Sequence, residues 1–388
     1  MILTAKQEEG LKIAIARYKA REPYTCIAGY AGAGKSTLVQ FIIAALDIDP
    51  VFITYIAYTG KAAQVLRNKN CPNAMTAHRL LYQSFPKKDG TFKHIPRDSL
   101  GPIKLIVVDE VSMLPKQMWE LLLSHKIHVI ALGDPGQLPP VAAEQHNILD
   151  HPHIFLDEIM RQAQESEIIR LTMDIREGKG LQPQLGNEVR IVDKDELLKP
   201  GFLAWGDQII CGKNETRYSI NRFMRKEIKG YEGEEPEVGD RIICLKNNWE
   251  LINSAGDALV NGLGGKIDSI KYTYDNPWMK KTPLITFTPE WEGATPFIEV
   301  ESDYKLLTEH EPTITKDNWG KVPRWWHPNQ FDYGYAITCH KSQGSEYDKV
   351  IVLEEYLKGD TKEEHGRWLY TAATRAAKKL IIVRNYRT

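Results

Sequence analysis

A glycine-rich loop near the start of the chain has the residue types that bind nucleotide phosphates. Residues 29–36 read GYAGAGKS, a full match to G-x-x-x-x-G-K-[ST] between an apolar run and a helical pattern. Backbone N–H groups of such a loop surround phosphates, and the helix N-terminus adds partial positive charge. A plain glycine turn is the alternative, but it would not need lysine and serine at these positions. The predicted phosphate site comprises Gly32, Gly34, Lys35, Ser36 and Thr37.

Further polar residues follow the next apolar runs. Asp109 comes directly after the run 105–108 and would bind Mg²⁺ together with the Ser36 hydroxyl, while Glu110 would act as general base toward the attacking water. Gln137 lies in the turn-rich stretch 133–140 and would hydrogen-bond the γ-phosphate. An exposed acidic loop and a simple Pro/Gly turn are the plainer interpretations of these two segments. The glycine loop upstream favours the catalytic interpretation.

Alternating strand and helix patterns must position these groups. Strands are predicted at 25–28, 51–57, 103–108 and 129–132, with a helix over 36–46 and another beginning at residue 60. Such alternation predicts a parallel sheet covered by helices on both faces. The pattern breaks between residues 81 and 101, where Asp89-Gly90 predicts the turn of a β-hairpin insert.

The sequence pattern changes twice in the second half of the chain. Strand patterns at 208–211, 349–353 and 380–383, with a helical pattern over 367–375, continue the α/β alternation. Between about 236 and 330, turn residues separate short β-like runs at 241–245, 266–272, 284–287 and 297–300. Six of the nine tryptophans fall there. We expect a small all-β module inserted into an α/β unit, with the tryptophans mainly in its core.

Composition excludes several classes of protein. The 388 residues suggest two or three domains at roughly 150 residues each. No uncharged apolar run approaches the roughly 18 residues that a membrane helix needs. The N-terminus shows no apolar signal-peptide region. The five cysteines are scattered and form no C-x-x-C pair, so we expect a reducing, cytosolic compartment.

Global charge balance conceals a basic segment. Lys and Arg total 50 and Asp and Glu total 51, which taken alone would argue against a nucleic-acid partner. Residues 61–104, however, contain nine basic and two acidic residues, a net charge of +7. Such a density suits the phosphate backbone of DNA and predicts salt-dependent binding. A solvated basic face is the alternative.

Nearly the whole chain resembles the superfamily 1 DNA helicases, in particular the compact, Dda-like form of their RecD-like branch. Besides the segments above, the resemblance rests on residues 3–7, 59–63, 76–81, 160–162, 335–346 and 369–376. Tyr58 departs from the branch, which usually has proline there. Only 28 residues precede the glycine loop, so we expect the long N-terminal extension of many members to be absent.

The resemblance assigns further site residues. It implies that Gln7 recognises adenine and that Gly344 and Glu346 contact the nucleotide. Arg161 and Arg375 would be arginine fingers on the γ-phosphate, although each could be an ordinary surface arginine. The implied DNA contacts are Thr59, Lys61, His78, Thr338 and His340, of which His340 could instead be structural. Phe92, beside the predicted hairpin turn, is the candidate wedge at a duplex fork, unless it only caps a local cluster.

The resemblance also implies an architecture and an activity. The expected fold is α/β, with two RecA-like parallel-sheet motor domains of the P-loop NTPase class, at 1–150 and at 151–235 plus 331–388. The hairpin insert would occupy about 82–101, and 236–330 would form a small β-barrel. The expected activity is ATP- and Mg²⁺-dependent unwinding by a monomer that moves 5′-to-3′ on single-stranded DNA and meets duplex forks, with possible replication or recombination partners.

Three alternatives stay open. The chain could be an ATP-regulated DNA-binding or remodelling protein that does not unwind. It could be the motor subunit of a larger recombination nuclease complex. An RNA helicase is the third alternative, which the RecD-like motifs disfavour.

Overall fold

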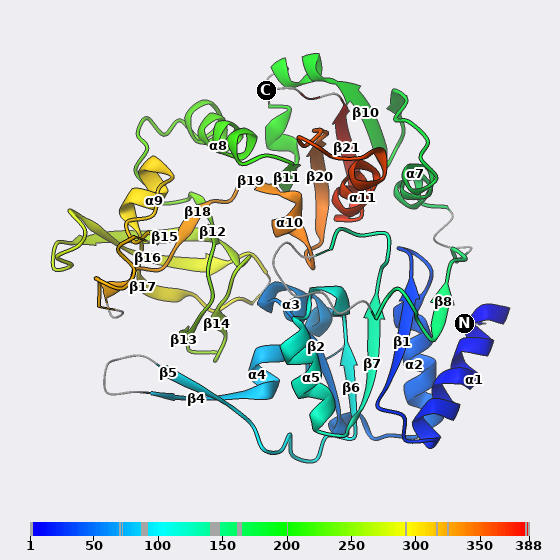
Figure 1. The fold of residues 1–388 in the computed structure, drawn as a ribbon. Helices are drawn as coiled ribbons and strands as arrows, with labels where there is room; N and C mark the ends of the chain where they lie inside the picture. Colours follow the sequence, from blue (N-terminus) through cyan, green and yellow to red (C-terminus); the bar gives the residue numbers. More distant parts are fainter. Residues whose placement is uncertain are drawn as a thin grey trace. The chain divides into compact units, whose positions relative to one another are not determined.

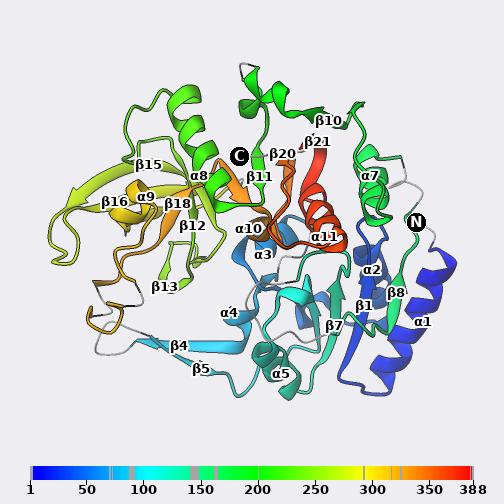
Figure 2. The same ribbon diagram turned by 45° about the horizontal axis from the view of Figure 1, so that its top comes forward.

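The computed structural model describes residues 3–69, 71, 73–86, 92–139, 148–160, 165–199, 201–291, 293–315, 317–323, 326–384 and 386. The chain forms two compact units (Figures 1 and 2). Unit 1 comprises Met1–Gln83, Pro96–Leu198 and Ser342–Thr388, and unit 2 comprises Ser84–Ile95 and Lys199–Lys341. Both ends of the chain therefore belong to unit 1.

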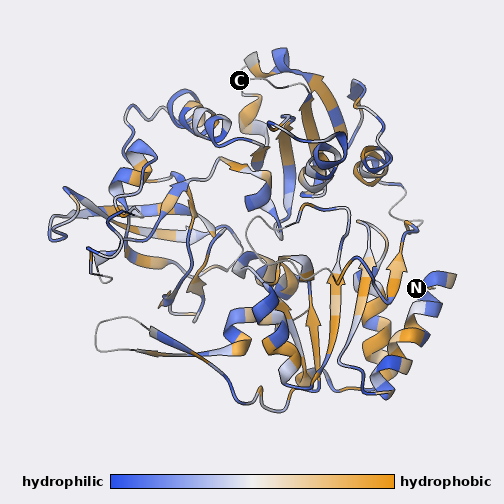
Figure 3. Cartoon of the chain, viewed as in Figure 1, coloured by the Kyte–Doolittle hydropathy of each residue, from blue (hydrophilic) through white to orange (hydrophobic). Residues whose placement is uncertain are grey.

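The larger sheet of unit 1 is parallel and confirms the alternation that the sequence predicts. Its order is β3 (Met75–Thr76), β2 (Ile53–Ala57), β6 (Leu105–Val108), β7 (His128–Gly133), β1 (Tyr24–Gly29), β8 (Ile154–Leu156). The strands are the most hydrophobic part of this unit (Figure 3). Because parallel strands carry helices on both faces, β6 is apolar and buried along its whole length.

Side chains of β6 alternate between two cores. Leu105 and Val107 pack with residues of α1 (Ala5–Lys19) and α2 (Lys35–Leu46). Ile106 and Val108 pack with residues of α4 (Ala77–Leu81) and α5 (Lys116–Ser124) on the other face. This two-residue alternation holds the carboxyl end of β6, and thus the acidic pair that follows it, at one edge of a rigid sheet.

A second group of strands in unit 1 comes from the C-terminal part of the chain. β20 (Tyr347–Leu353), β21 (Ala376–Arg384) and β10 (Val189–Asp193) are parallel, and the short β9 (Gln184–Leu185) pairs antiparallel with β10. α7 (Glu167–Arg176) and α11 (Lys362–Ala373) pack with them.

Helix α11 begins earlier and ends earlier than the pattern 367–375 predicts. Its first turn is fixed by a capping box, in which Thr361 and Glu364 each satisfy the other's backbone N–H. The helix ends at Ala373, so Arg375 lies after it, immediately before β21. The expectation that Arg375 belongs to the helix is therefore wrong.

Unit 2 contains an antiparallel five-stranded sheet. Its order is β17 (Phe297–Glu301), β16 (Thr282–Pro289), β15 (Gly264–Thr273), β12 (Arg241–Cys244), β18 (Phe331–Tyr333). A bridge between Ser302 and Asn329 joins the ends of the two edge strands, so the sheet curls toward closure. Phenylalanines fill its core, whereas Trp278 and Trp319 are 43% and 45% exposed. The expectation of core tryptophans is wrong for these two, because both lie in connecting segments outside the strands.

The remaining elements of the chain are short. β13 (Asn248–Ile252) pairs with β14 (Ala258–Leu259), and β11 (Gln208–Cys211) pairs in parallel with β19 (Ala336–Thr338). Unit 2 also contains α8 (Asn214–Phe223), α9 (Tyr304–Glu309) and all but the last residue of α10 (Cys339–Ser342). β4 (Tyr82–Pro86) and β5 (Phe92–Pro96) form a two-stranded sheet, and the predicted turn Asp89-Gly90 lies outside the described residues. In the part of the chain that the structure describes, no helix is long and apolar enough to cross a bilayer.

Candidate nucleotide site

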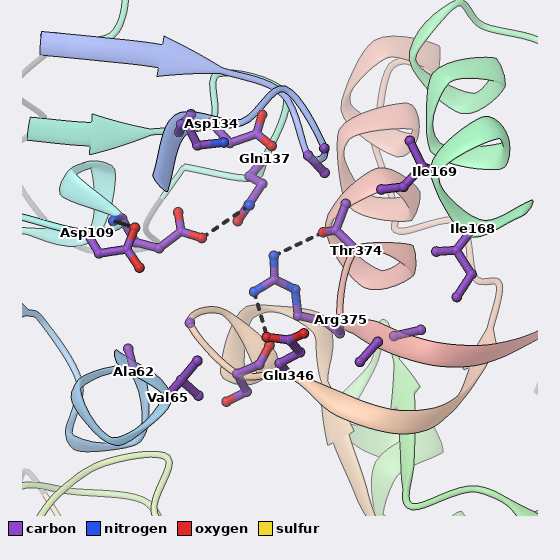
Figure 4. A pocket seen from close by; sticks show the side chains of 18 of the residues that line it. Ala62, Val65, Asp109, Asp134, Gln137, Ile168, Ile169, Glu346, Thr374 and Arg375 are labelled. Carbon is purple, nitrogen blue, oxygen red and sulfur yellow. Dashed lines mark hydrogen bonds between the residues drawn. The ribbon is translucent and has the colours of Figure 1, made fainter. Parts of the chain in front are cut away.

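Unit 1 contains a cavity of about 460 Å³ lined by segments from both ends of the chain (Figure 4). Its wall combines the glycine loop, the acidic pair, the turn after β7, the start of α7, residues 344–346 before β20 and residues 374–377 after α11. Eight of the predicted nucleotide-site residues line it: Gly32, Lys35, Asp109, Glu110, Gln137, Gly344, Glu346 and Arg375. The fold therefore assembles in one place groups that the sequence separates by more than three hundred positions.

The glycine loop joins β1 to α2 in the conformation that its residue types favour. Gly32 and Gly34 have φ values of +78° and +79°, a region that glycine adopts without strain. The Lys35 ammonium donates to the carbonyl oxygens of Gly29 at 2.6 Å and Tyr30 at 3.2 Å. Ser36 lies in the first turn of α2, where free N–H groups and the helix dipole attract anions. The loop thus presents a cation and backbone donors to one small volume.

Two carboxyls face this volume from the end of β6. Burial raises the pKa of Asp109 and of Glu110, and the neighbouring Asp109 charge raises the pKa of Glu110 further. The charges of Lys35 and Arg375 oppose both shifts. Glu110 Oε1 accepts a hydrogen bond from Gln137 Nε2 at 3.3 Å. A carboxyl whose pKa is raised is a stronger base once ionised, which suits Glu110 for proton abstraction.

Arg375 is buried at the cavity wall and is held by three acceptors. Its guanidinium donates to Thr371 O at 3.0 Å, Ser345 O at 3.3 Å and Thr374 Oγ1 at 3.0 Å. Figure 4 shows the guanidinium between Thr374 and Glu346, directed toward the acidic pair. Only 4% of the residue is exposed. Arg375 is therefore not an ordinary surface arginine on a solvent-exposed helix face.

Four described residues of the predicted nucleotide site do not line the cavity: Gln7, Gly34, Ser36 and Thr37. Gln7 is 1% exposed, and its amide donates to Gly34 O at 3.4 Å and Ala33 O at 3.5 Å while accepting from the Thr4 N–H. Gln7 therefore braces the glycine loop from α1. Arg161 lies outside the described residues.

Some lining residues have no local motif that could have revealed them. Lys69, just after α3 (Gly60–Asn68), forms an ion pair with Glu346 at 2.6 Å. Ile168 and Ile169 contribute an apolar wall at the start of α7. Lysine after a helix and isoleucine within one are common, so only tertiary contacts distinguish these residues.

The predicted DNA-contacting residues occur in both units. In unit 1, Thr59 caps α3 by accepting from the Ala62 N–H, the Lys61 ammonium lies 3.9 Å above the Tyr347 ring, and the His78 ring stacks on Tyr82. In unit 2, Thr338 ends β19, His340 lies in α10 and Phe92 begins β5.

Helix α3 connects two of the predicted DNA-contacting residues, Thr59 and Lys61, to the cavity. Gly344 packs so closely on α3 that an added Cβ would lie 3.1 Å from Ala62 Cβ and 3.5 Å from Thr59 Oγ1. The end of α3 that carries Thr59 and Lys61 therefore contacts the segment 344–347, of which Gly344 and Glu346 line the cavity.

The oxygen ligands at the site fit magnesium. The Ser36 hydroxyl and the Asp109 carboxylate are hard donors, as Mg²⁺ prefers. Among the described residues, no group of three or more His, Cys, Asp or Glu side chains could hold a metal ion by itself. Mg²⁺ does not need one, because it is usually held by one or two protein ligands together with substrate phosphates.

Two sequence families match this chain. Residues 3–195 match the AAA domain family, and residues 333–383 match the UvrD-like helicase C-terminal domain family. These two matches contain all the segments that line the cavity, with residues 31–169 in the first and 344–377 in the second.

Similar proteins extend over almost the whole chain. The ATP-dependent DNA helicase dda of Enterobacteria phage T4 is 22% identical over 96% of this chain and 97% of its own length. An uncharacterized protein, R530, of Acanthamoeba polyphaga mimivirus is 31% identical over 91% of this chain and 93% of its own length. The crystal structure of Pif1 helicase from Bacteroides in complex with ADP-AlF3 and ssDNA aligns with a TM-score of 0.54 at 17% identity, covering 100% of this chain and 94% of that one.

Other similar proteins are longer. The chain spans 45% of the ATP-dependent RecD2 DNA helicase of Deinococcus radiodurans, which is 25% identical over 90% of this chain. It spans 36% of an uncharacterized protein of Methanocaldococcus jannaschii that is 23% identical over 92% of this chain.

Proposed function

We propose that this chain, which belongs to the ATP-hydrolysing superfamily 1 DNA helicases, unwinds duplex DNA while moving 5′-to-3′ along one strand. Its relatives include proteins of the Dda and RecD types. The observation that carries the proposal is the cavity in which Lys35, Glu110 and Arg375 meet, since these are the groups that phosphoryl transfer requires. Two RecA-like motor domains, at 1–150 and at 151–235 plus 331–388, form part of the proposal, with 236–330 as an inserted β-barrel.

The proposed chemistry distributes roles over the cavity wall. Lys35 and the N–H groups of the glycine loop bind the β- and γ-phosphates of ATP, and Gln7 supports that loop beside the adenine. Glu110 takes a proton from the attacking water, which Gln137 helps to orient. Arg375 neutralises charge that develops on the γ-phosphate, and Arg161, which lies outside the described residues, is proposed to do the same.

Magnesium is proposed as the cofactor, bound by Ser36 and Asp109. When bound, it neutralises phosphate charge as the bond to the γ-phosphate breaks. Burial raises the pKa of Asp109, and a nearby dication would oppose this shift by favouring the ionised carboxylate.

Coupling to DNA is proposed to pass through α3. DNA contacts by Thr59 and Lys61 would act on α3, whose residues Ala62 and Val65 line the cavity together with Lys69, which follows the helix. His78, in α4, would add a further DNA contact. Thr338 and His340 would add contacts from the segment that precedes Gly344. Proposed partners are single-stranded DNA and duplex forks, with replication or recombination proteins as further candidates.

Unwinding polarity is tested with partial duplexes that carry one single-stranded tail, either 5′ or 3′. We expect ATP-dependent strand displacement with a 5′ tail and at least about tenfold slower displacement with a 3′ tail. Displacement that prefers the 3′ tail would overturn the direction. Equal displacement with ATP and with a non-hydrolysable analogue would favour a DNA-remodelling protein, and co-elution with a nuclease from the native source would favour a complex subunit.

Replacing Phe92 by alanine is expected to separate unwinding from hydrolysis. Phe92 is the first residue of β5 and follows the predicted turn at Asp89-Gly90, where a wedge against a fork would act. We expect DNA-stimulated ATP hydrolysis within twofold of wild type and strand displacement slower by about tenfold, since unstacking a base pair costs a few kcal/mol. Ile95→Ala, in the same strand, is the control. Unchanged displacement of a forked duplex would exclude Phe92 as the wedge.

A further inference from the structure

Tyr370 lies within α11 and joins that helix to two loops of the nucleotide site. Its hydroxyl accepts a hydrogen bond from the Ala31 N–H at 2.9 Å and donates one to Asp134 Oδ2 at 2.7 Å. The residue is 2% exposed, and burial raises the pKa of Tyr370, so the phenol keeps the proton that it donates. Ala31 belongs to the glycine loop, and Asp134 begins the segment 134–138, which we call the sensor loop. One buried hydroxyl therefore bridges both loops.

Two other side chains hold the opposite end of the sensor loop. Thr371 Oγ1 accepts from the Leu138 N–H at 2.8 Å, and Gln343 Nε2 donates to the Leu138 carbonyl at 2.6 Å. Leu138 directly follows Gln137, whose amide donates to Glu110. The loop that presents Gln137 to the general base is thus anchored at both ends by residues from the C-terminal part of the chain.

The sensor loop also packs directly against the tyrosine ring. A Cβ added at Gly136 would lie 3.1 Å from Tyr370 Cε1, so the backbone at this position is in close contact with the ring. The Gly136 N–H donates to Asp134 Oδ1 at 2.9 Å, while Tyr370 uses the other carboxylate oxygen. Both carboxylate oxygens of Asp134 therefore accept hydrogen bonds, which fix the orientation of its side chain.

We infer that Tyr370 and Thr371 are positioning residues, whose hydroxyls hold the glycine loop and the sensor loop in the geometry that ATP hydrolysis requires. The inference rests on the nucleotide site proposed above. Helix α11 ends at Ala373, two residues before Arg375, and Arg375 donates to the Thr371 carbonyl. A shift of α11 must therefore act on the glycine loop, the sensor loop and the arginine finger together.

Tyr370→Phe tests the bridging hydroxyl, because it removes one oxygen and keeps the buried ring. We expect kcat/KM for ATP in DNA-stimulated hydrolysis to fall about tenfold, the factor that corresponds to a hydrogen bond with a charged partner. Tyr356→Phe is the matched control: Tyr356 is 59% exposed and its ring stacks on His365, so wild-type kcat/KM is expected. A wild-type value for Tyr370→Phe, or an equal loss in Tyr356→Phe, overturns the role of Tyr370.

Thr371 is tested by a pair of substitutions. Thr371→Val keeps the shape but removes the acceptor for the Leu138 N–H, and we expect kcat to fall about fivefold with KM changed less, because Leu138 adjoins Gln137. Thr371→Ser keeps the hydroxyl and should restore kcat. Equal kcat values for valine and serine overturn the role of Thr371.

Further measurements distinguish a loss of positioning from a loss of folding and from an error in the proposed nucleotide site. Single-stranded DNA affinity without nucleotide, and thermal unfolding, report the folded fraction; a loss that vanishes after this correction overturns the inference. Lys35→Ala is measured in parallel. If Lys35→Ala keeps wild-type turnover, the proposed nucleotide site fails; if it is inactive and Tyr370→Phe is normal, only the positioning role fails.

Discussion

Lys35→Ala is expected to lower DNA-stimulated ATP turnover by about 1,000-fold, the upper range for removing one preorganised electrostatic group from an active site. The Lys35 ammonium is the cation of the glycine loop, where it donates to the carbonyls of Gly29 and Tyr30. Alanine leaves the backbone donors in place but removes the charge that would meet the β- and γ-phosphates. Phosphate release from ATP, measured with saturating single-stranded DNA, gives the result directly.

The matched control for this substitution is Lys12→Ala, an exposed lysine on α1. We expect Lys12→Ala to keep wild-type turnover. DNA binding without nucleotide should stay within twofold of wild type in both variants. Near-normal turnover in Lys35→Ala would contradict the assignment of the glycine loop as the ATP site.

Arg375→Ala is expected to reduce kcat by about 1,000-fold while changing nucleotide affinity much less, because an arginine finger acts mainly on charge in the transition state. The buried guanidinium is aligned by three acceptors and faces the carboxyls of Asp109 and Glu110. Single-turnover hydrolysis, together with binding of a fluorescent ADP analogue, separates the catalytic step from binding.

Arg375→Lys distinguishes charge from geometry. Lysine keeps the positive charge but lacks the planar fork that bonds Thr371 O, Ser345 O and Thr374 Oγ1, so we expect it to recover only a small part of kcat. Arg367→Ala, on the exposed side of α11, is the control and should keep wild-type kcat. A kcat for Arg375→Ala within tenfold of wild type would exclude the finger role.

Local sequence predicted much of the first half of the chain. Strands β1, β6 and β7 and helix α2 lie where apolar runs and helical spacing placed them, because a strand buried on both faces of a parallel sheet must be apolar throughout. Prediction was poorer at α11, where the start depends on the capping box of Thr361 and Glu364 rather than on apolar spacing. Burial of Trp278 and Trp319 was also misjudged, since both lie in segments that connect helices or strands, and the sequence pattern does not show whether such a segment folds onto the core.

The sequence by itself determined the phosphate-binding loop, because G-x-x-x-x-G-K-[ST] contains within eight residues the left-handed glycines, the cation and the helix start that this chemistry needs. It also placed the acidic pair, since carboxylates after a buried strand must lie at the sheet edge. The family resemblance implied that Arg375 and Glu346 contact the nucleotide, and the tertiary structure places both at the same cavity as Lys35. Only the tertiary structure decided that Lys69 and Ile168 line this cavity and that the Tyr370 hydroxyl joins Ala31 to Asp134. Those contacts join residues far apart in the chain, so they depend on how helices and sheets pack, which no local pattern encodes.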